Sequence, residues 1–296
     1  MTEGVPPFLL KKMRIIEGAP LRYFLAVQDG EIELNRLIGK HLTLVHSGAI
    51  YCQACGNTTR KSYGQGHCYP CFKRLARCDL CVMAPHRCHY DQGTCREPEW
   101  GENFCMQPHL VYLANSSGLK VGITREGGHS VRWRDQGALQ GRVIARAQTR
   151  KAAGELETQL AKTLGDRSQW RALVSSDANP IDLDAEARRA RELVPDPGSQ
   201  VRYVERPDEA VAEQLDYPVS QWPPVVRLNF KKTNQVAGVL RGMKGQYLLF
   251  DTGVFNVREH GGYEVVLTLE QAVPDSADDS AVAKSANQSD LFEQEP

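Results

Sequence analysis

Residues 52–71 read CQACGNTTRKSYGQGHCYPC, a stretch in which two Cys-x2-Cys pairs are separated by twelve residues. Each pair predicts a tight turn, here called a knuckle, that directs two sulfur atoms at one centre. Two knuckles complete a tetrahedron around a zinc ion. The predicted ligands of this zinc ribbon are Cys52, Cys55, Cys68 and Cys71. Because four thiolates leave no open coordination position, we expect the zinc to be structural, with redox thiols or disulfides as the alternative.

Five more cysteines follow the ribbon before the pattern ends. They are Cys78, Cys81, Cys88, Cys95 and Cys105. Together with His89 they offer more ligands than one further zinc ion requires. The sequence therefore predicts a second zinc site but does not determine its fourth ligand. Buried free thiols are the alternative interpretation.

The dense cysteine spacing favours metal binding over a secreted disulfide framework. No apolar run approaches the roughly 18–20 residues that cross a bilayer. Lys11, Lys12 and Arg14 follow the first short apolar patch, whereas a secretory signal places its positive charge first. We expect a soluble, cytoplasmic protein without a membrane partner.

The formal net charge of +0 conceals an uneven distribution along the chain. Residues 51–171 carry 18 Lys and Arg against 10 Asp and Glu, whereas residues 172–224 carry 5 against 11. A basic middle region suits a polyanionic partner, so the sequence predicts nucleic-acid binding. Uneven charge without functional meaning is the alternative.

The patterning predicts an α+β fold of several regions. Residues 1–51 carry short β runs, and residues 52–108 are rich in Cys, Gly and Pro, so little regular structure is expected there. Residues 109–174 predict two strands, at 110–114 and 119–124, followed by a helix at 152–164. Residues 175–224 form a helical and Pro-rich connector, with its helix at 182–193. Residues 225–273 predict four strands of a small β-barrel that the N-terminal strands could complete.

Five short motifs in residues 110–170 follow one another in a recognisable order. They are Leu110-Val111-Tyr112, Lys120-Val121-Gly122, Arg132-Trp133, Leu156-Glu157 and Arg167-Ser168-Gln169-Trp170. This segment resembles the GIY-YIG endonuclease superfamily, most closely the branch with Lys in the second signature position. The resemblance covers about a fifth of the chain, and it implies a GIY-YIG-like αβ domain.

The resemblance also implies a catalytic centre made of Tyr112, Lys120, Arg132 and Glu157. Tyr112 would orient or deprotonate a water, Arg132 would grip the phosphate, and Glu157 would bind Mg²⁺ or Mn²⁺. Lys120 stands where the nuclease branches usually have a second tyrosine, and it could act as a base or as a phosphate contact. We expect Arg125 and Arg134 to contact nucleic acid as well. The alternatives are a core tyrosine, an Arg132–Asp135 ion pair and a solvent-exposed Glu157.

Over a longer span the chain resembles an uncharacterised bacterial family, a domain of unknown function that joins such a cysteine cluster to such a segment. Residues 93–98 and 132–138 carry this resemblance. It predicts the architecture and implies no known activity.

The acidic tail, residues 274–296, is expected to be disordered. Its motif Gln288-Ser289-Asp290-Leu291-Phe292 resembles the pentapeptide by which bacterial replication and repair proteins dock on the DNA sliding clamp. In that motif Gln288 would bind a polar subsite, and Leu291 and Phe292 would fill an apolar pocket. Asp290 is predicted to contact the partner as well. An unused terminus is the alternative.

Three functions are compatible with these patterns. The first is a DNA-processing, Mg²⁺-dependent endonuclease in bacterial replication or repair, or a degenerate relative of one. The second is a non-catalytic nucleic-acid-binding adaptor recruited to the sliding clamp. The third is a zinc-dependent protein-interaction module.

Overall fold

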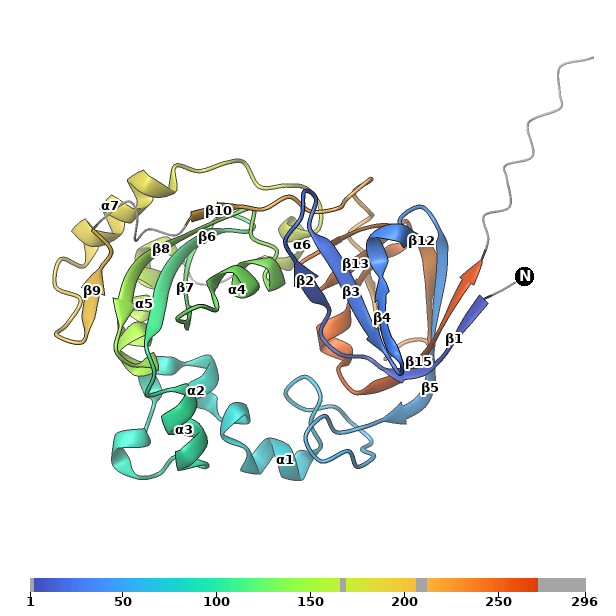
Figure 1. Ribbon diagram of the computed structural model, residues 1–296, viewed down its shortest axis with the longest axis horizontal. Helices are drawn as coiled ribbons and strands as arrows, with labels where there is room; N and C mark the ends of the chain where they lie inside the picture. Colours follow the sequence, from blue (N-terminus) through green and yellow to red (C-terminus); the bar gives the residue numbers. More distant parts are fainter. Residues whose placement is uncertain (1–2, 166–168, 206–211, 271–296) are drawn as a thin grey trace, which may run out of the picture.

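The computed structural model describes residues 3–165, 169–205 and 212–270, and their strands form three sheets (Figure 1). Sheets and helices both occur, which confirms the mixed α+β class. The two larger sheets follow one another along the long axis, and the cysteine-rich region runs along one side of both (Figure 1).

The largest sheet combines strands from both ends of the chain. Its members are β1 (Glu3–Leu9), β5 (His41–Ile50), β11 (Arg227–Leu228), β12 (Gln235–Lys244), β13 (Tyr247–Phe250), β14 (Gly253–Asn256) and β15 (Tyr263–Glu270). Their spatial order is β1-β15-β5-β12-β13-β14-β11, so β1 and β11 are edges. The helical turn η5 (Val257–His260) connects β14 to β15.

The expected small barrel is wrong, because none of the described sheets is closed. Prolines lie within one edge strand of the large sheet and shortly before the other. Pro6 and Pro7 lie at a bulge in β1, between the paired residues Val5 and Phe8. Pro223 and Pro224 shortly precede β11, which contains only two residues. Since proline cannot donate a ladder hydrogen bond, these segments are suited to edges and not to closure.

A small antiparallel sheet packs against this large sheet. It consists of β2 (Arg14–Ile16), β3 (Arg22–Val27) and β4 (Gly30–Glu33), followed by the turn η1 (Leu34–Leu37). The Asn35 side chain fixes the turn, because it accepts from the Tyr23 amide at 2.8 Å and donates to the Leu21 carbonyl at 2.9 Å. Tyr23 is fully buried in the largest apolar cluster.

The third sheet contains the segment that resembles the nuclease. Its strands are β6 (His109–Asn115), β7 (Leu119–Arg125), β8 (Gln140–Ala147), β9 (Val201–Tyr203) and β10 (Ala212–Gln214). Its helices are α4 (His129–Asp135), α5 (Arg150–Leu164), α6 (Trp170–Leu173) and α7 (Leu183–Leu193). The predicted strands at 110–114 and 119–124 and the predicted helices at 152–164 and 182–193 are confirmed. Thr149 caps α5 and Asp182 caps α7 through side-chain oxygens that accept backbone N–H groups.

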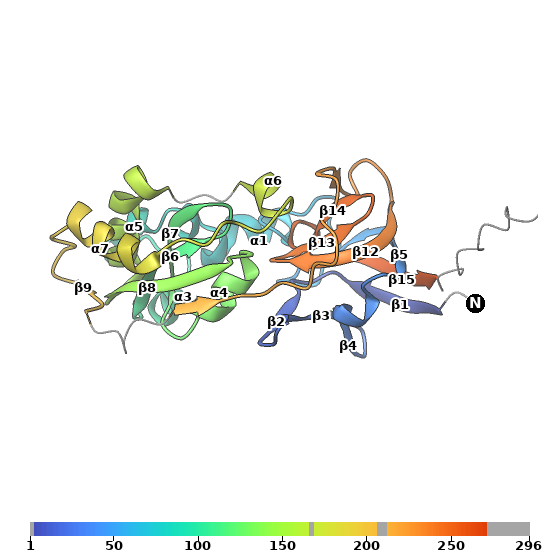
Figure 2. The same cartoon turned by 90° about the horizontal axis from the view of Figure 1, so that it is seen from above.

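Strand β6 is buried along its whole length and separates two cores. Val111 and Leu113 face α5 in one apolar cluster. Leu110, Tyr112 and Ala114 belong to the other cluster, which also contains Trp133 of α4 and the core of the large sheet. This alternation follows from the two-residue period of a strand. It places α4 and α5 on opposite faces of the sheet (Figure 2).

The cysteine-rich region contains more helix than expected. Its elements are α1 (Tyr69–Arg74), η2 (Ala76–Cys78), α2 (Leu80–Met83), η3 (Pro85–Arg87), η4 (Tyr90–Gln92) and α3 (Pro98–Phe104). Pro70, Pro85 and Pro98 each stand in the first turn of one of these helices. A proline there loses no hydrogen bond and has the helical φ, so these prolines start helices and do not interrupt them.

The tightest contact of the cysteine-rich region with α5 is at Gly154. A Cβ atom at Gly154 would lie 2.5 Å from the Pro85 Cβ and 2.9 Å from the His86 amide nitrogen. One turn further along α5, the Thr158 hydroxyl oxygen lies 2.9 Å from the His86 Nδ1. Only glycine therefore allows the turn η3 to approach the helix this closely.

The substitution Gly154→Ala tests this contact. In an exposed helix it would stabilise the fold by about 1 kcal/mol. Here we expect it to lower the free energy of unfolding by about 1–3 kcal/mol, because the methyl group displaces the η3 backbone. Thermal unfolding measures the change. The control is Gln159→Ala at an exposed position of the same helix, and a Gly154→Ala protein that melts at or above the wild-type temperature would contradict the contact.

Candidate functional site

The first four cysteines stand on two linked turns. The Gly56 amide donates to the Cys52 carbonyl at 2.8 Å, which closes the first knuckle. The second knuckle opens α1, where the Phe72 amide donates to the Cys68 carbonyl at 2.9 Å. A hydrogen bond of 2.7 Å from the Gln53 amide to the Gly66 carbonyl joins the two turns. The backbone thus brings the two pairs together, as their spacing predicts.

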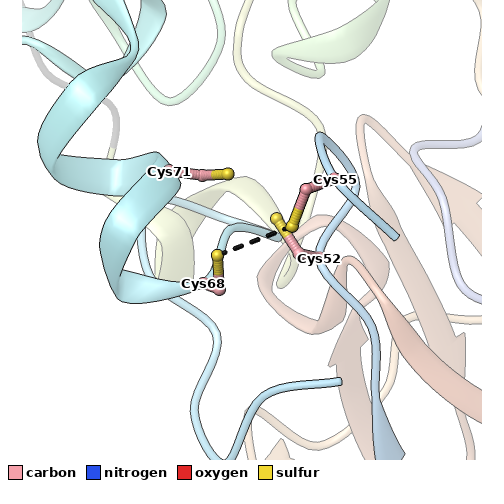
Figure 3. A group of neighbouring side chains, drawn as sticks. All are labelled: Cys52, Cys55, Cys68 and Cys71. Carbon is pink, nitrogen blue, oxygen red and sulfur yellow. Dashed lines mark hydrogen bonds between the residues drawn. The ribbon is translucent and has the colours of Figure 1, made fainter. Parts of the chain in front are cut away.

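The four sulfur atoms form a cluster that could hold a zinc ion (Figure 3). All four lie within 4.8 Å of one another, and the Sγ atoms of Cys55 and Cys68 are 3.8 Å apart. A tetrahedron with zinc–sulfur bonds of about 2.3 Å separates its sulfur atoms by roughly 3.8 Å. The spacing and the donor set therefore fit zinc.

The surroundings of these thiols favour negative charge on one of them. Burial raises the pKa of Cys52, but the backbone N–H groups of Cys68, Cys55 and Ala54 outweigh burial and lower it to about 6. Hydrogen bonding to the neighbouring cysteines raises the pKa of Cys71 to about 12. Ionising one thiol thus opposes ionisation of the next, and a bound cation would remove this conflict.

The other five cysteines divide into two groups. Cys78 packs against the first cluster and its neighbour Leu75. The remaining four, Cys81, Cys88, Cys95 and Cys105, all line one small cavity. Asp79, Cys81 and His89 also lie within 4.8 Å of one another by their ligand atoms.

Tyr112 is the centre of the second candidate site. It lies on β6, is fully buried, and donates from its hydroxyl to the Gln136 Oε1 at 3.1 Å. The Lys120 Nζ on β7 donates to the same oxygen at 2.8 Å, and Lys120 is 5% exposed. Gln136 follows α4 and thus connects the two signature positions. Of the predicted alternatives, a core environment does apply to Tyr112.

Arg132 and Glu157 share the surroundings of Tyr112. Burial raises the pKa of Tyr112, Arg132 lowers it by its charge and by a hydrogen bond, and the Glu157 carboxylate raises it. Both Arg132 and Glu157 are half-buried. Tyr112 and Lys120 thus meet at Gln136, and the charges of Arg132 and Glu157 both act on Tyr112.

Two further arginines belong to this centre, although the sequence did not single them out. Burial lowers the pKa of Arg150 at the start of α5, where Arg132 and Glu157 both act on it. Burial also lowers the pKa of Arg258 in η5, and the charge of Arg132 adds to this effect. Arg258 donates to the Gln65 side chain, between the two knuckles. No sequence motif indicates either residue, because Arg150 and Arg258 are far apart in the chain and meet the centre only through tertiary packing.

Gly122 provides the space that the Tyr112 ring occupies. It lies opposite Tyr112 in the β6–β7 ladder, and a Cβ atom there would lie 2.6 Å from the Tyr112 hydroxyl oxygen. The tyrosine ring therefore crosses the neighbouring strand at the one position without a side chain. The second signature motif, Lys120-Val121-Gly122, already includes this glycine, so the sequence could have indicated its role.

The remaining predicted residues lie elsewhere. Arg125 is exposed, and its guanidinium carbon lies 4.6 Å from the centroid of the Phe104 ring. Arg134 lies 3.9 Å from the Glu213 carboxylate and 4.0 Å from that of Glu17, so acidic groups already neutralise its charge. The tail motif, with Gln288, Asp290, Leu291 and Phe292, lies outside the described residues, as do residues 167 and 168.

Removing one ligand of the four-cysteine cluster tests the zinc assignment. We expect Cys71→Ser to lower the zinc content by one ion per chain and the free energy of unfolding by about 4 kcal/mol or more, because loss of a metal is among the largest single effects. Elemental analysis and thermal unfolding measure the two changes. The exposed substitution Thr58→Ser, between the knuckles, is the control. Wild-type protein that binds no zinc and melts unchanged in the presence of a chelator would contradict the assignment.

None of the described helices combines the length and apolar character needed to cross a membrane. Comparison with curated proteins and with solved structures finds no match. A family model does match residues 39–265, and its description is a protein of unknown function, DUF2797. This match spans the cysteine-rich region and the segment around Tyr112, as the longer resemblance implied. Since the match covers most of the chain, the protein belongs to the DUF2797 family of unknown function.

Proposed function

We propose that this protein binds nucleic acid and cleaves its phosphodiester bonds with the help of Mg²⁺ or Mn²⁺. The observation that carries the proposal is the convergence of Tyr112, Lys120, Arg132 and Glu157, which the resemblance to GIY-YIG nucleases had singled out from separate motifs. The family assignment does not supply an activity.

The surplus of arginine supports a phosphate as the ligand of this centre. The Nε atoms of Arg132 and Arg150 are buried and have no hydrogen-bond partner within the described part of the chain, as is also true of Arg134, Arg142, Arg146 and Arg241 elsewhere. A buried donor without a partner costs about 1–3 kcal/mol. An incoming phosphate would satisfy such donors, and Arg258 would add charge to the same region.

Each residue has a role that its surroundings allow. Tyr112 stays protonated at neutral pH because burial raises its pKa, so it donates a hydrogen bond and does not act as a base. Arg132 holds the phosphate, and Lys120 contacts it or the leaving oxygen. Glu157 is the carboxylate available for a divalent ion, which fits a metal held by one carboxylate and by substrate phosphates. When bound, such an ion polarises the phosphate and activates water.

A second function is favoured by one observation. Tyr112 has no exposed surface and its hydroxyl is occupied by Gln136. In this arrangement the centre could recognise a phosphate through its arginines without cutting the chain. The protein would then be a nucleic-acid-binding adaptor with the nuclease fold retained for recognition.

Cleavage assays distinguish the two functions. Purified protein is incubated with linear and branched DNA in the presence of Mg²⁺ or Mn²⁺. We expect Glu157→Gln to reduce the cleavage rate by roughly 100-fold or more, because the metal loses its carboxylate. The control is Glu155→Gln, an exposed carboxylate two residues earlier on α5. Wild-type protein that binds but cuts neither substrate would exclude the nuclease and leave the adaptor.

Binding itself should depend on salt. Log K falls as log salt rises, and each phosphate contact makes this slope steeper by about 1. Arg132→Ala should therefore weaken binding uniformly across sequences and make the slope shallower. Titrations at several salt concentrations measure it. Binding that is absent, or independent of salt, would favour a zinc-dependent protein-interaction module over both functions.

We also propose that the tail recruits the protein to the DNA sliding clamp. The support is the motif at residues 288–292, an apolar pair within a polar tail. We expect Leu291→Ala combined with Phe292→Ala to abolish capture by immobilised clamp, since the pair would lose its pocket. Val282→Ala is the control in the same tail. Equal capture of the double variant would refute the motif.

A further inference from the structure

We infer a second metal site, which takes zinc through four thiolates, formed by Cys81, Cys88, Cys95 and Cys105. Of the five cysteines that follow the first cluster, these four bind the metal and Cys78 does not. Metal binding at this site is independent of whether the protein cleaves nucleic acid.

The four cysteines surround one small cavity of about 10 Å³. They come from four separate turns of chain: Cys81 from α2, Cys88 from the end of η3, Cys95 from the segment before α3, and Cys105 from the end of α3. A volume of this size holds about one water-sized particle, and hence one ion. Cys88 and Cys105 are buried, and Cys81 and Cys95 are partly buried.

Within the described part of the chain, the cysteines that line this cavity are Cys81, Cys88, Cys95 and Cys105. The fifth cysteine, Cys78, packs instead against the first cluster.

The chain makes room for this group. A Cβ atom at Gly101 of α3 would lie 3.1 Å from the Cys95 Sγ and 2.9 Å from the Tyr90 ring. Any larger residue at position 101 would push the sulfur away from the cavity. The four sulfur atoms are less tightly grouped than those of the first cluster, so metal binding would draw their short segments inward.

Residues 79–105 lack the apolar packing that would stabilise them without a metal. Within this fully described segment, no side chain joins any of the apolar clusters of the protein. Its helices have three to seven residues, far below the length at which a helix is stable alone. Small regions without an apolar core commonly depend on a structural metal.

A rival group of ligands, Asp79, Cys81 and His89, is already engaged. One Asp79 oxygen accepts from the Cys81 amide at 3.2 Å and the other lies 2.6 Å from the Arg96 Nε. The His89 Nδ1 lies 2.7 Å from the Thr94 hydroxyl. These bonds organise the loop beside the cavity. The Cys95 thiol is engaged as well, because it donates to the Glu97 carbonyl at 3.5 Å, but four thiolates are softer and more suitable zinc ligands than a set that contains a carboxylate.

The inferred site would also position Arg150, a role that depends on the proposed function. The Arg150 amide donates to the Cys105 carbonyl at 2.8 Å, and its guanidinium donates to the Val82 carbonyl at 2.6 Å. Its guanidinium carbon lies 5.8 Å from the centroid of the Phe104 ring. Two ligand turns thus hold the arginine that lies near Arg132 and Glu157.

Zinc stoichiometry tests the inference on the full chain. We expect two zinc ions per wild-type chain, one in Cys105→Ser, one in Cys71→Ser and none in the double variant. Cys78→Ser and His89→Gln should each retain two. A single ion in Cys78→Ser or in His89→Gln would overturn the ligand set, and two ions in Cys105→Ser would refute it as well.

A second measurement needs no substitution and covers the case in which a variant fails to fold. X-ray absorption at the zinc edge of the wild-type protein should give a first shell of four sulfur atoms at about 2.3 Å for each ion. A shell that mixes sulfur with nitrogen or oxygen would assign the rival group. Wild-type protein with a single zinc ion would show that these four thiols do not bind metal.

Discussion

The convergence of the Cys52, Cys55, Cys68 and Cys71 sulfurs on one point is the constraint on which the middle of this protein depends. Residues 52–105 connect the large sheet to the sheet that contains Tyr112, yet most of their side chains join no apolar core in the described structure. Hydrophobic burial cannot therefore fix this connection, as it fixes the sheets. Hydrogen bonds between the knuckles and the contact of η3 with Gly154 determine where the sulfurs stand. A tetrathiolate metal would hold what these few contacts arrange.

The Tyr112 centre depends on that arrangement. Its residues come from β6, β7, α4 and α5, while Arg258 comes from the large sheet and contacts Gln65 between the knuckles. Positive charge is in excess there, because Arg132, Arg150 and Arg258 are all partly buried, while Glu157 acts on Arg150 and Asp135 acts on Arg258. Such a balance suits an anionic ligand, and it gives the basic composition of residues 51–171 a location. Burial raises the pKa of Tyr112, and its hydroxyl donates a hydrogen bond to Gln136.

Glycine determines how closely the parts approach one another. The Tyr112 ring crosses Gly122, the Trp133 ring lies over Gly141, and Pro85 rests on Gly154. In each case a methyl group would meet the neighbouring atoms at 2.6 Å or less. The three glycines are far apart in the sequence. Each allows a neighbouring side chain to pack directly on the backbone, and this is evident only once that neighbour is known.

The sequence by itself determined the elements and the first metal cluster. The spacing of residues 52–71, the strands of the β6–β7 hairpin, and the helices α5 and α7 follow from local rules, because their partners are near in the chain. Only the tertiary structure decided that the large sheet stays open, with β1 and β11 as its two edges. It also separated Cys78 from the other four cysteines and added Gln136, Arg150 and Arg258 to the centre around Tyr112. These contacts join residues that are distant in sequence, and their geometry is set by packing between elements and not by any local pattern.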